Sequence, residues 1–297
     1  MDTTNVARGA IVVGVDGSGS AARALSWAVD QAVVEGRPLV LAHAVSPGDA
    51  TWLDPMASSY QVGTDELRAH GHELLRAARA AADSRHPGLE VHTALRLVDA
   101  RHLLLTLAED AAMVVLGSHG RGPVRSLLLG SVGVALSRHL RCPLVIHRPG
   151  SEGRVRHGVL VGDDGTRDSR DVLEFAFRQA SLRHLPLTVQ HSVWDSEAAD
   201  AGPHPLGAGS ARFEEQRLVV AESISGFGER YPDVRVEVTL ARGHAADCLV
   251  LESRRMDLLV VGRHEAGPLT RITRGSVATT VVEHASCPVA VVPVDSQ

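Results

Sequence analysis

In the stretch "GSHGRGPVRSLLLGS", residues 117–131, Gly117, Gly120, Gly130 and Ser131 are spaced in a way that suits phosphate binding. Gly117 and Gly120 follow the apolar run "AAMVVL", which reads as a buried strand. Because glycine has no side chain, the backbone at both positions can approach a ligand closely. Gly130 and Ser131 begin a helical segment, whose free N–H groups and dipole favour an anion. A turn would explain any one glycine, but the combination predicts a site for phosphates.

A carboxylate is expected beside these glycines. Asp16 ends the apolar run "AIVVGVD", which reads as the first strand. In doubly wound α/β folds, ligands bind beyond the carboxyl ends of the strands, where the winding direction reverses. If the first and fourth strands are neighbours, Asp16 and Gly117 emerge side by side at that crevice.

The chain contains an internal repeat. The segment "IVVGVDGSGSAARALSWAV" recurs as "VLVGDDGTRDSRDVLEFAF", which pairs Asp16 with Asp164 at an offset of 148. The segment "MVVLGSHGRGP" recurs as "LLVVGRHEAGP", which pairs Gly117 with Gly262 at an offset of 145. The second copy is therefore three residues shorter, and the long loops "SPGDATWLDPMASSYQ" and "WDSEAADAGPHPLGAG" are the natural place for the difference.

Each copy alternates short apolar strands with amphipathic helices, which is typical of a parallel sheet covered on both faces. In the first copy, we expect Ser20 to cap a helix that Gly36 ends. The sequence predicts two similar α/β domains, each with five parallel strands and helices on both faces. Their predicted limits are residues 1–149 and residues 157–297, with a linker at 150–156.

The composition points away from several other classes of protein. The formal net charge of −5 does not favour a nucleic-acid partner. No uncharged apolar run reaches the roughly 18 residues of a membrane span, and the N-terminus lacks a basic-then-apolar leader. We therefore expect a cytoplasmic protein with no membrane partner. The three cysteines, Cys142, Cys248 and Cys287, have no metal-ligand spacing, so we expect no metal site and no disulfide.

On these motifs and the duplication, the sequence resembles the tandem universal stress proteins, which have two domains of the UspA type. Gly117, Gly120, Gly130 and Ser131 match the motif of the ATP-binding branch of that family without a gap. The resemblance covers nearly the whole chain. It implies a Rossmann-like fold of the adenine nucleotide alpha hydrolase type, with a five-stranded parallel sheet of order 3-2-1-4-5 in each domain.

The resemblance also implies which residues hold ATP, with or without Mg²⁺. Asp16 and the second-strand residue Ala44 would meet the adenine and its surroundings, although family sites often have valine at the second position. Gly117 and Gly120 would flank the ribose and the phosphates. The phosphate chain would be held by the residues that open the next helix, which are Gly130, Ser131 and Val132.

Polar side chains inside the glycine stretch are further candidates. His119 lies in the loop and is the histidine of the first copy best placed to touch a ligand. Arg121 and Arg125 could neutralise phosphates, although surface arginines are usually only solvated. His43 and His191 match across the copies at strand ends, where we expect them to be structural.

The second copy departs from the motif. Glu265 stands where the second motif glycine should be, and it adds both a side chain and a negative charge near the predicted phosphates. We predict weaker ATP binding in this copy, or an altered pose, unless Arg263, Arg271 and Arg274 compensate. The counterparts of the remaining site residues are Asp164, Gly262, Gly275, Ser276 and Val277.

Four functions are open at this point. The first is an ATP-binding regulatory protein of the stress response without substantial catalysis, since no nucleophile or general base stands beside the phosphate motif. The second is a slow ATPase or an ATP-pyrophosphatase-like enzyme, which normally needs a Ser-Gly-Gly-x-Asp-Ser loop where this chain has "VDGSGS". The third, a dinucleotide-dependent oxidoreductase, rests on a weak Gly-x-Gly-x-x-Ala match at residues 17–22. The fourth is a nucleotide-free module that binds partner proteins.

The last strand of each copy, "PLVIH" and "PVAVVPV", lies at a sheet edge in the strand order that the resemblance implies. An apolar edge of this kind invites pairing. The resemblance therefore implies an intrachain pseudo-dimer of the two copies, and we expect the chain to form a homodimer as well.

Overall fold

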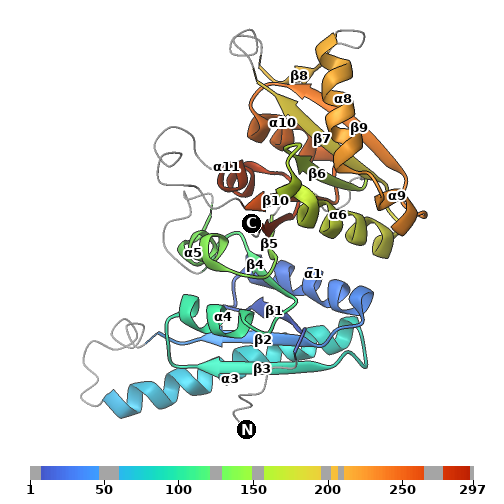
Figure 1. Cartoon of the computed structure of the whole chain (residues 1–297). Coiled ribbons are helices and arrows are strands. Elements are labelled where there is room, and N and C mark those ends of the chain that lie inside the picture. The colour runs from blue at the N-terminus through green and yellow to red at the C-terminus, as the bar shows by residue number, and fades with distance from the viewer. Residues whose placement is uncertain are drawn as a thin grey trace. The chain divides into compact units, whose positions relative to one another are not determined.

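The computed structural model of the chain describes residues 8–46, 60–120, 129–148, 157–194, 202–206, 211–263 and 277–294. It divides into two compact units, Met1–His147 and Arg148–Gln297, which are called unit 1 and unit 2 below (Figure 1). The predicted linker at 150–156 lies outside the described residues, and the predicted domain limits stay a prediction. None of the described helices combines the length and the apolar content that a membrane span requires.

Unit 1 contains a five-stranded parallel sheet of order β3-β2-β1-β4-β5, which confirms the predicted topology. The central strand β1 pairs Ile11 with Leu39 of β2 and with Met113 of β4. Its elements are β1 (Ile11–Gly14), α1 (Gly19–Glu35), β2 (Leu39–Ala44), α3 (Tyr60–Arg85), β3 (Val91–Arg96), α4 (Ala100–Ala108), β4 (Met113–Gly117), α5 (Ser131–His139) and β5 (Leu144–His147).

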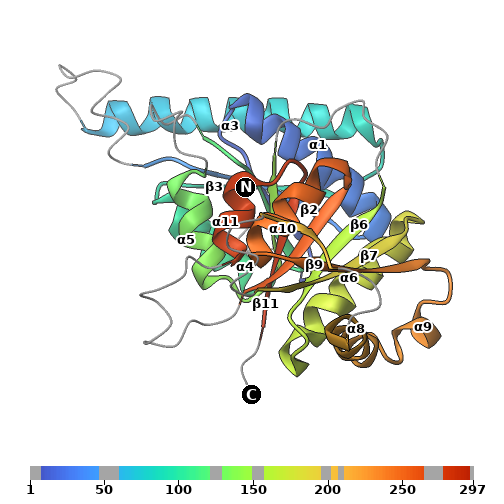
Figure 2. The same ribbon diagram turned by 90° about the horizontal axis from the view of Figure 1, so that it is seen from above.

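Helices cover both faces of this sheet. Helices α1 and α3 run beside each other on one face, and α4 packs next to α5 on the other (Figure 2). The strands β1 and β4 are therefore buried on both sides, and Ile11–Val13 and Met113–Val115 are fully inaccessible to solvent. This burial explains why both strands read as continuous apolar runs rather than as alternating patterns.

Unit 2 repeats the arrangement with the strand order β9-β7-β6-β10-β11. Helix α6 contacts β6, and α8 contacts β9. Helices α10 and α11 pack against each other and contact β7 and β10. Its elements are β6 (Val159–Asp163), α6 (Arg170–Arg183), β7 (Leu187–Val193), β8 (His204–Pro205), α8 (Ala211–Ser223), α9 (Phe227–Arg230), β9 (Val236–Arg242), α10 (Ala245–Glu252), β10 (Leu258–Arg263), α11 (Val277–His284) and β11 (Val289–Pro293).

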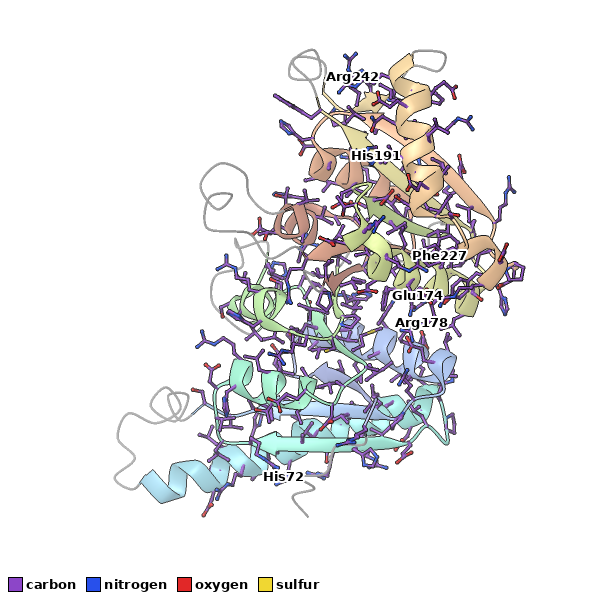
Figure 3. All side chains as sticks on the ribbon, in the orientation of Figure 1. His72, Glu174, Arg178, His191, Phe227 and Arg242 are labelled. Carbon is purple, nitrogen blue, oxygen red and sulfur yellow. The ribbon has the colours of Figure 1, made fainter. Side chains whose placement is uncertain are left out.

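Unit 2 has two further features. A short strand, β8, pairs antiparallel with the end of β9 through His204 and Arg242, a residue labelled in Figure 3. Unit 2 also packs Phe227 of α9 on the ring of Phe177 of α6, with 4.7 Å between centroids. The aromatic stack packs α9 against α6.

The first turn of α1 begins at a different serine from the one predicted. Ser18 is the N-cap, and its hydroxyl oxygen accepts a hydrogen bond from the Ala21 N–H at 3.1 Å. Ser20 is instead buried inside the helix, so its prediction as the cap was wrong. At the other end, Gly36 has a φ of 61° and closes the helix as predicted.

The counterpart of Gly36 in unit 2 is His184, which ends α6 with a φ of 53°. A left-handed conformation is strained for any residue with a Cβ. We expect His184→Gly to stabilise unit 2 by about 0.5–1 kcal/mol, since the strain relief exceeds the entropic cost of glycine. Urea unfolding of the full chain measures the change. The reciprocal variant Gly36→His should destabilise unit 1 by a similar amount, and equal stabilities for all three proteins would contradict this explanation.

Candidate functional site

The turn after β1 brings Asp16 to the end of β4. Asp16 is half-buried, and its Oδ1 accepts a hydrogen bond from the Ser18 N–H at 2.9 Å. Its other oxygen, Oδ2, points towards Gly120, where an added Cβ would lie only 2.8 Å away. Gly120 itself is exposed. A carboxylate from one strand end and bare backbone from another therefore meet at the carboxyl edge of the unit 1 sheet.

Gly117 has a packing role that the sequence did not reveal. A Cβ on Gly117 would lie 2.6–2.8 Å from the Oγ, the carbonyl carbon and the carbonyl oxygen of Ser20. The absence of a side chain thus allows β4 to approach the first turn of α1. Close contact between strand and helix explains this glycine without any ligand.

A cluster of hydroxyl groups, also missed from the sequence, supports the loop that starts at Gly117. Ser118 is fully buried, and its hydroxyl lies 2.9 Å from His119 Nδ1 and 3.4 Å from the Ser20 hydroxyl. The Ser18 hydroxyl, at 3.5 Å, lies near the backbone carbonyl oxygen of His119. These contacts orient the half-buried imidazole of His119. The sequence could have indicated this cluster, because serines lie close to the motif residues Asp16 and Gly117.

The start of α5 is fixed to the end of β4. The Gly130 N–H donates a hydrogen bond to the Ser118 carbonyl oxygen at 3.0 Å, and a Cβ on Gly130 would lie 3.9 Å from the Gly120 nitrogen. Gly130 is the N-cap of α5 and provides no side-chain cap, so the amides of the first turn lack that partner. Ser131 is exposed and Val132 is half-buried. Within the described residues, the geometry places the start of α5, without a side-chain cap from Gly130, close to Gly120.

Of the three remaining predicted residues of the first copy, the structure describes one. Ala44 is the half-buried last residue of β2, the strand beside β1. It therefore lies at the same edge of the sheet as Asp16. Arg121 and Arg125 lie outside the described residues.

The corresponding turn of unit 2 is organised differently. Asp164 is exposed, and its Oδ1 accepts hydrogen bonds from the Thr166 N–H at 2.9 Å and from the hydroxyls of Thr166 and Ser169, both at 2.6 Å. Its own loop therefore engages this carboxylate, whereas within the described residues Asp16 accepts a hydrogen bond from the Ser18 N–H. Gly262 is half-buried at β10, and Val277 is exposed at the start of α11. Glu265, Gly275 and Ser276 lie outside the described residues.

The matched histidines are structural in both units, as predicted. His43 Nδ1 donates to the carbonyl oxygen of Val15 at 2.7 Å, and His191 Nδ1 donates to that of Asp163 at 2.9 Å. Each histidine therefore ties the second strand of its unit to the end of the first. Within the described part of the chain, no group of three or more His, Cys, Asp or Glu side chains is placed to hold a metal ion.

The sequence profile of the Universal stress protein family matches residues 8–148 and again residues 156–293. The chain belongs to the universal stress protein family. It is similar to a universal stress protein of Mycobacterium tuberculosis, with 36% identity, and to one of Mycolicibacterium smegmatis, with 33% identity. Each alignment covers 95% of this chain and 96% of the relative.

A solved structure supports the fold. The crystal structure of a universal stress protein from Archaeoglobus fulgidus DSM 4304 superposes with a TM-score of 0.68 at 17% identity, covering 97% of both chains. The superposition agrees with the fold along nearly the whole chain, and the family profile matches the chain twice.

Proposed function

We propose that unit 1 of this universal stress protein binds an adenine nucleotide, ATP, and acts as a regulatory protein in the response to stress. The observation that carries the proposal is the convergence of three elements on one place. The Asp16 carboxylate after β1, the bare backbone of Gly120 after β4 and the uncapped first turn of α5 adjoin one another. Such a combination offers backbone donors to phosphates and a carboxylate to the sugar or base.

The residues of unit 1 fit a nucleotide in the following way. The N–H groups of Ser131 and Val132, at the positive end of α5, would hold the phosphate chain. Gly120 would let the phosphates approach, because its Cα carries no side chain. Asp16 and Ala44 would face the adenine side, and His119 and Arg121 are the side chains we propose beside the phosphates. A Mg²⁺ ion would arrive bound to the phosphates of ATP.

Gly117 is proposed to act by positioning its neighbours in the site. Its close contact with Ser20 sets the position of the end of β4, and thereby of His119 and Gly120. We keep it among the site residues for this reason.

Unit 2 is proposed to bind the nucleotide more weakly or in another pose. Asp164 already accepts three hydrogen bonds from its own loop, so it is less available to a ligand than Asp16. The residue of unit 2 that corresponds to Gly120 is a glutamate, Glu265. The proposed contacts of this unit are those of Asp164, Gly262, Gly275, Ser276 and Val277.

We further propose that unit 1 binds ATP without turning it over at the rates of an enzyme. The hydroxyl nearest to a histidine in the described site is that of Ser118, but this serine is fully buried and contacts Ser20 as well. It is therefore badly placed to attack a phosphate. Slow ATP hydrolysis is the alternative, and turnover that Asp16→Asn abolishes would favour it.

The remaining proposals concern location and assembly. Two family domains in one chain fit an intrachain pseudo-dimer. A homodimer of the whole chain and a cytoplasmic location are proposed with it.

Mass analysis of the small molecules released by denaturing the purified protein tests the nucleotide proposal. We expect an adenine nucleotide at close to one molecule per chain, because a single competent site is proposed. The same preparation of an Asp16→Asn variant should release less. A wild-type protein that releases no nucleotide, and takes up none from millimolar ATP, would contradict the proposal.

A further inference from the structure

Beneath α8, unit 2 has polar side chains at positions where unit 1 has buried apolar ones. At the end of the first strand, Val15 of unit 1 corresponds to Asp163 of unit 2 at the offset of 148. On the covering helix, Ala78 corresponds to Ser223 at the offset of 145. Val15 and Ala78 are both buried, and Asp163 is only 4% exposed. A carboxyl group has therefore been placed in what is apolar core in the first copy.

A third exchange lies beside the matched histidines, His43 of unit 1 and His191 of unit 2. Gly71 of α3 corresponds to Gln216 of α8, and a Cβ on Gly71 would lie 3.2 Å from the His43 ring. In unit 2 the Gln216 side chain instead reaches His191, with 2.8 Å between Oε1 and Nε2. His191 is labelled in Figure 3. The three exchanged positions, Asp163, Gln216 and Ser223, all carry hydrogen-bonding side chains in unit 2.

The carboxyl group of Asp163 is incompletely satisfied. Its Oδ1 accepts a hydrogen bond from the Gly165 N–H at 3.1 Å, whereas its Oδ2 is buried without a hydrogen-bond partner in the described structure. An unmatched buried oxygen is costly when it is charged. The cost is smaller when the oxygen carries a proton, because the net charge is then removed.

The charged and titratable groups around Asp163 come from two elements. His191 on β7 favours the carboxylate, and Asp164 in the adjoining turn opposes it, while α8 contributes the hydroxyl of Ser223. Burial outweighs these influences and raises the pKa of the Asp163 carboxyl above its ordinary value of 3.8. The closed structure therefore favours the neutral acid more than the opened form does.

The position of this carboxyl group links it to α8 and to the turn before α6. Asp163 accepts from Gly165, and a Cβ on Gly165 would lie 2.5 Å from Val219 of α8. Helix α8 thus sits directly on the turn that Asp163 holds. Ionisation of Asp163 would create a charge that is best solvated when α8 moves away.

We propose that Asp163 is a proton-binding switch of unit 2, in which the bound proton holds α8 and the turn before α6 against the sheet and its loss loosens them. The ligand of this buried site is thus a proton, which binds the Asp163 carboxyl group. The switch goes beyond nucleotide binding and does not depend on it.

The direction of the pH effect follows from proton linkage. The opened form loses its proton near pH 3.8, whereas the closed form keeps it to a higher pH. Closure is therefore fully favoured below pH 3.8 and is weakened as the pH rises towards the pKa of the closed form. Between these two values, the equilibrium constant for opening rises by up to about tenfold per pH unit.

Hydrogen exchange of the full chain, without nucleotide, tests the switch between pH 4 and pH 8. We expect peptides from α8 to lose protection as the pH rises, after division by the intrinsic exchange rate. Peptides from α3 serve as the internal control, since Val15 and Ala78 take the equivalent places there, and they should show no such trend. Asp163→Val should abolish the trend in α8, and so should Asp163→Asn if the valine variant folds poorly.

Asp168→Asn is the matched control, because it removes an exposed carboxylate from the same turn. It should leave the pH dependence of α8 unchanged. Equal pH dependence in α3 and α8 of the wild-type chain would overturn the proposal. A trend in α8 that survives in both Asp163 variants would overturn it as well.

Discussion

Gly120→Glu should reduce the affinity of unit 1 for ATP by roughly thirtyfold, which corresponds to about 2 kcal/mol. The substitution copies the residue of the second repeat into the first. Two like charges about 5 Å apart repel by about 3 kcal/mol at an effective dielectric near 20, and solvent screening reduces this value. The new carboxylate would lie beside Asp16 and close to the proposed phosphates, since a Cβ at position 120 is already 2.8 Å from Asp16 Oδ2.

Titration with a fluorescent ATP analogue measures this loss, and Gly120→Gln is the matched control. Glutamine has the size of glutamate without the charge, so the difference between the two variants isolates the electrostatic contribution. Gly120 is not among the glycines with a positive φ in the described structure, so neither side chain strains the backbone. Wild-type affinity in the glutamate variant would show that the phosphates lie elsewhere.

Gly117→Ala should destabilise unit 1 by about 2–3 kcal/mol, because the added methyl group overpacks the contact between β4 and α1. Two of the three atoms that it meets belong to the Ser20 backbone, at 2.7 and 2.8 Å. Backbone inside a helix cannot turn aside as a flexible side chain can, so α1 and β4 must separate.

Urea unfolding followed by the fluorescence of Trp27 on α1 measures this loss, in a chain where the other two tryptophans, Trp52 and Trp194, are phenylalanine. Gly228→Ala is the control, since a Cβ at that helical position meets nothing within 4 Å. It should leave stability unchanged or raise it slightly. A Gly117→Ala protein within about 0.5 kcal/mol of the parent chain, the spread of ordinary surface substitutions, would contradict the packing role of this glycine.

Periodicity was sufficient to predict alternating strands and helices, and Gly36 marked the end of α1, because both depend on local patterns. The strand order was predicted from the resemblance to the universal stress proteins, since the pairing of distant strands leaves no local pattern in the sequence. The capping serine was predicted wrongly, since Ser18 and Ser20 are chemically identical and only the position of the first helical turn distinguishes them. Strand β8 was also missed. It has two residues, lies in a segment that reads as loop, and depends on pairing with β9.

The site was harder to predict than the fold. The sequence predicted the same role for Gly117 and Gly120, which was close approach to the ligand. In the structure, a Cβ on Gly117 would meet Ser20, whereas a Cβ on Gly120 would meet Asp16. The direction in which a missing side chain would point depends on tertiary packing. The same holds for Asp163 and Asp164, which are adjacent and alike in sequence but buried and exposed in the structure.

The central claim is that the chain has one competent nucleotide site, in unit 1, and it is tested most directly by calorimetric titration of the full-length protein with ATP. The account predicts one site of higher affinity per chain, which Gly120→Glu removes, with any second site clearly weaker. Two equal sites, or a single site that survives Gly120→Glu, would contradict it.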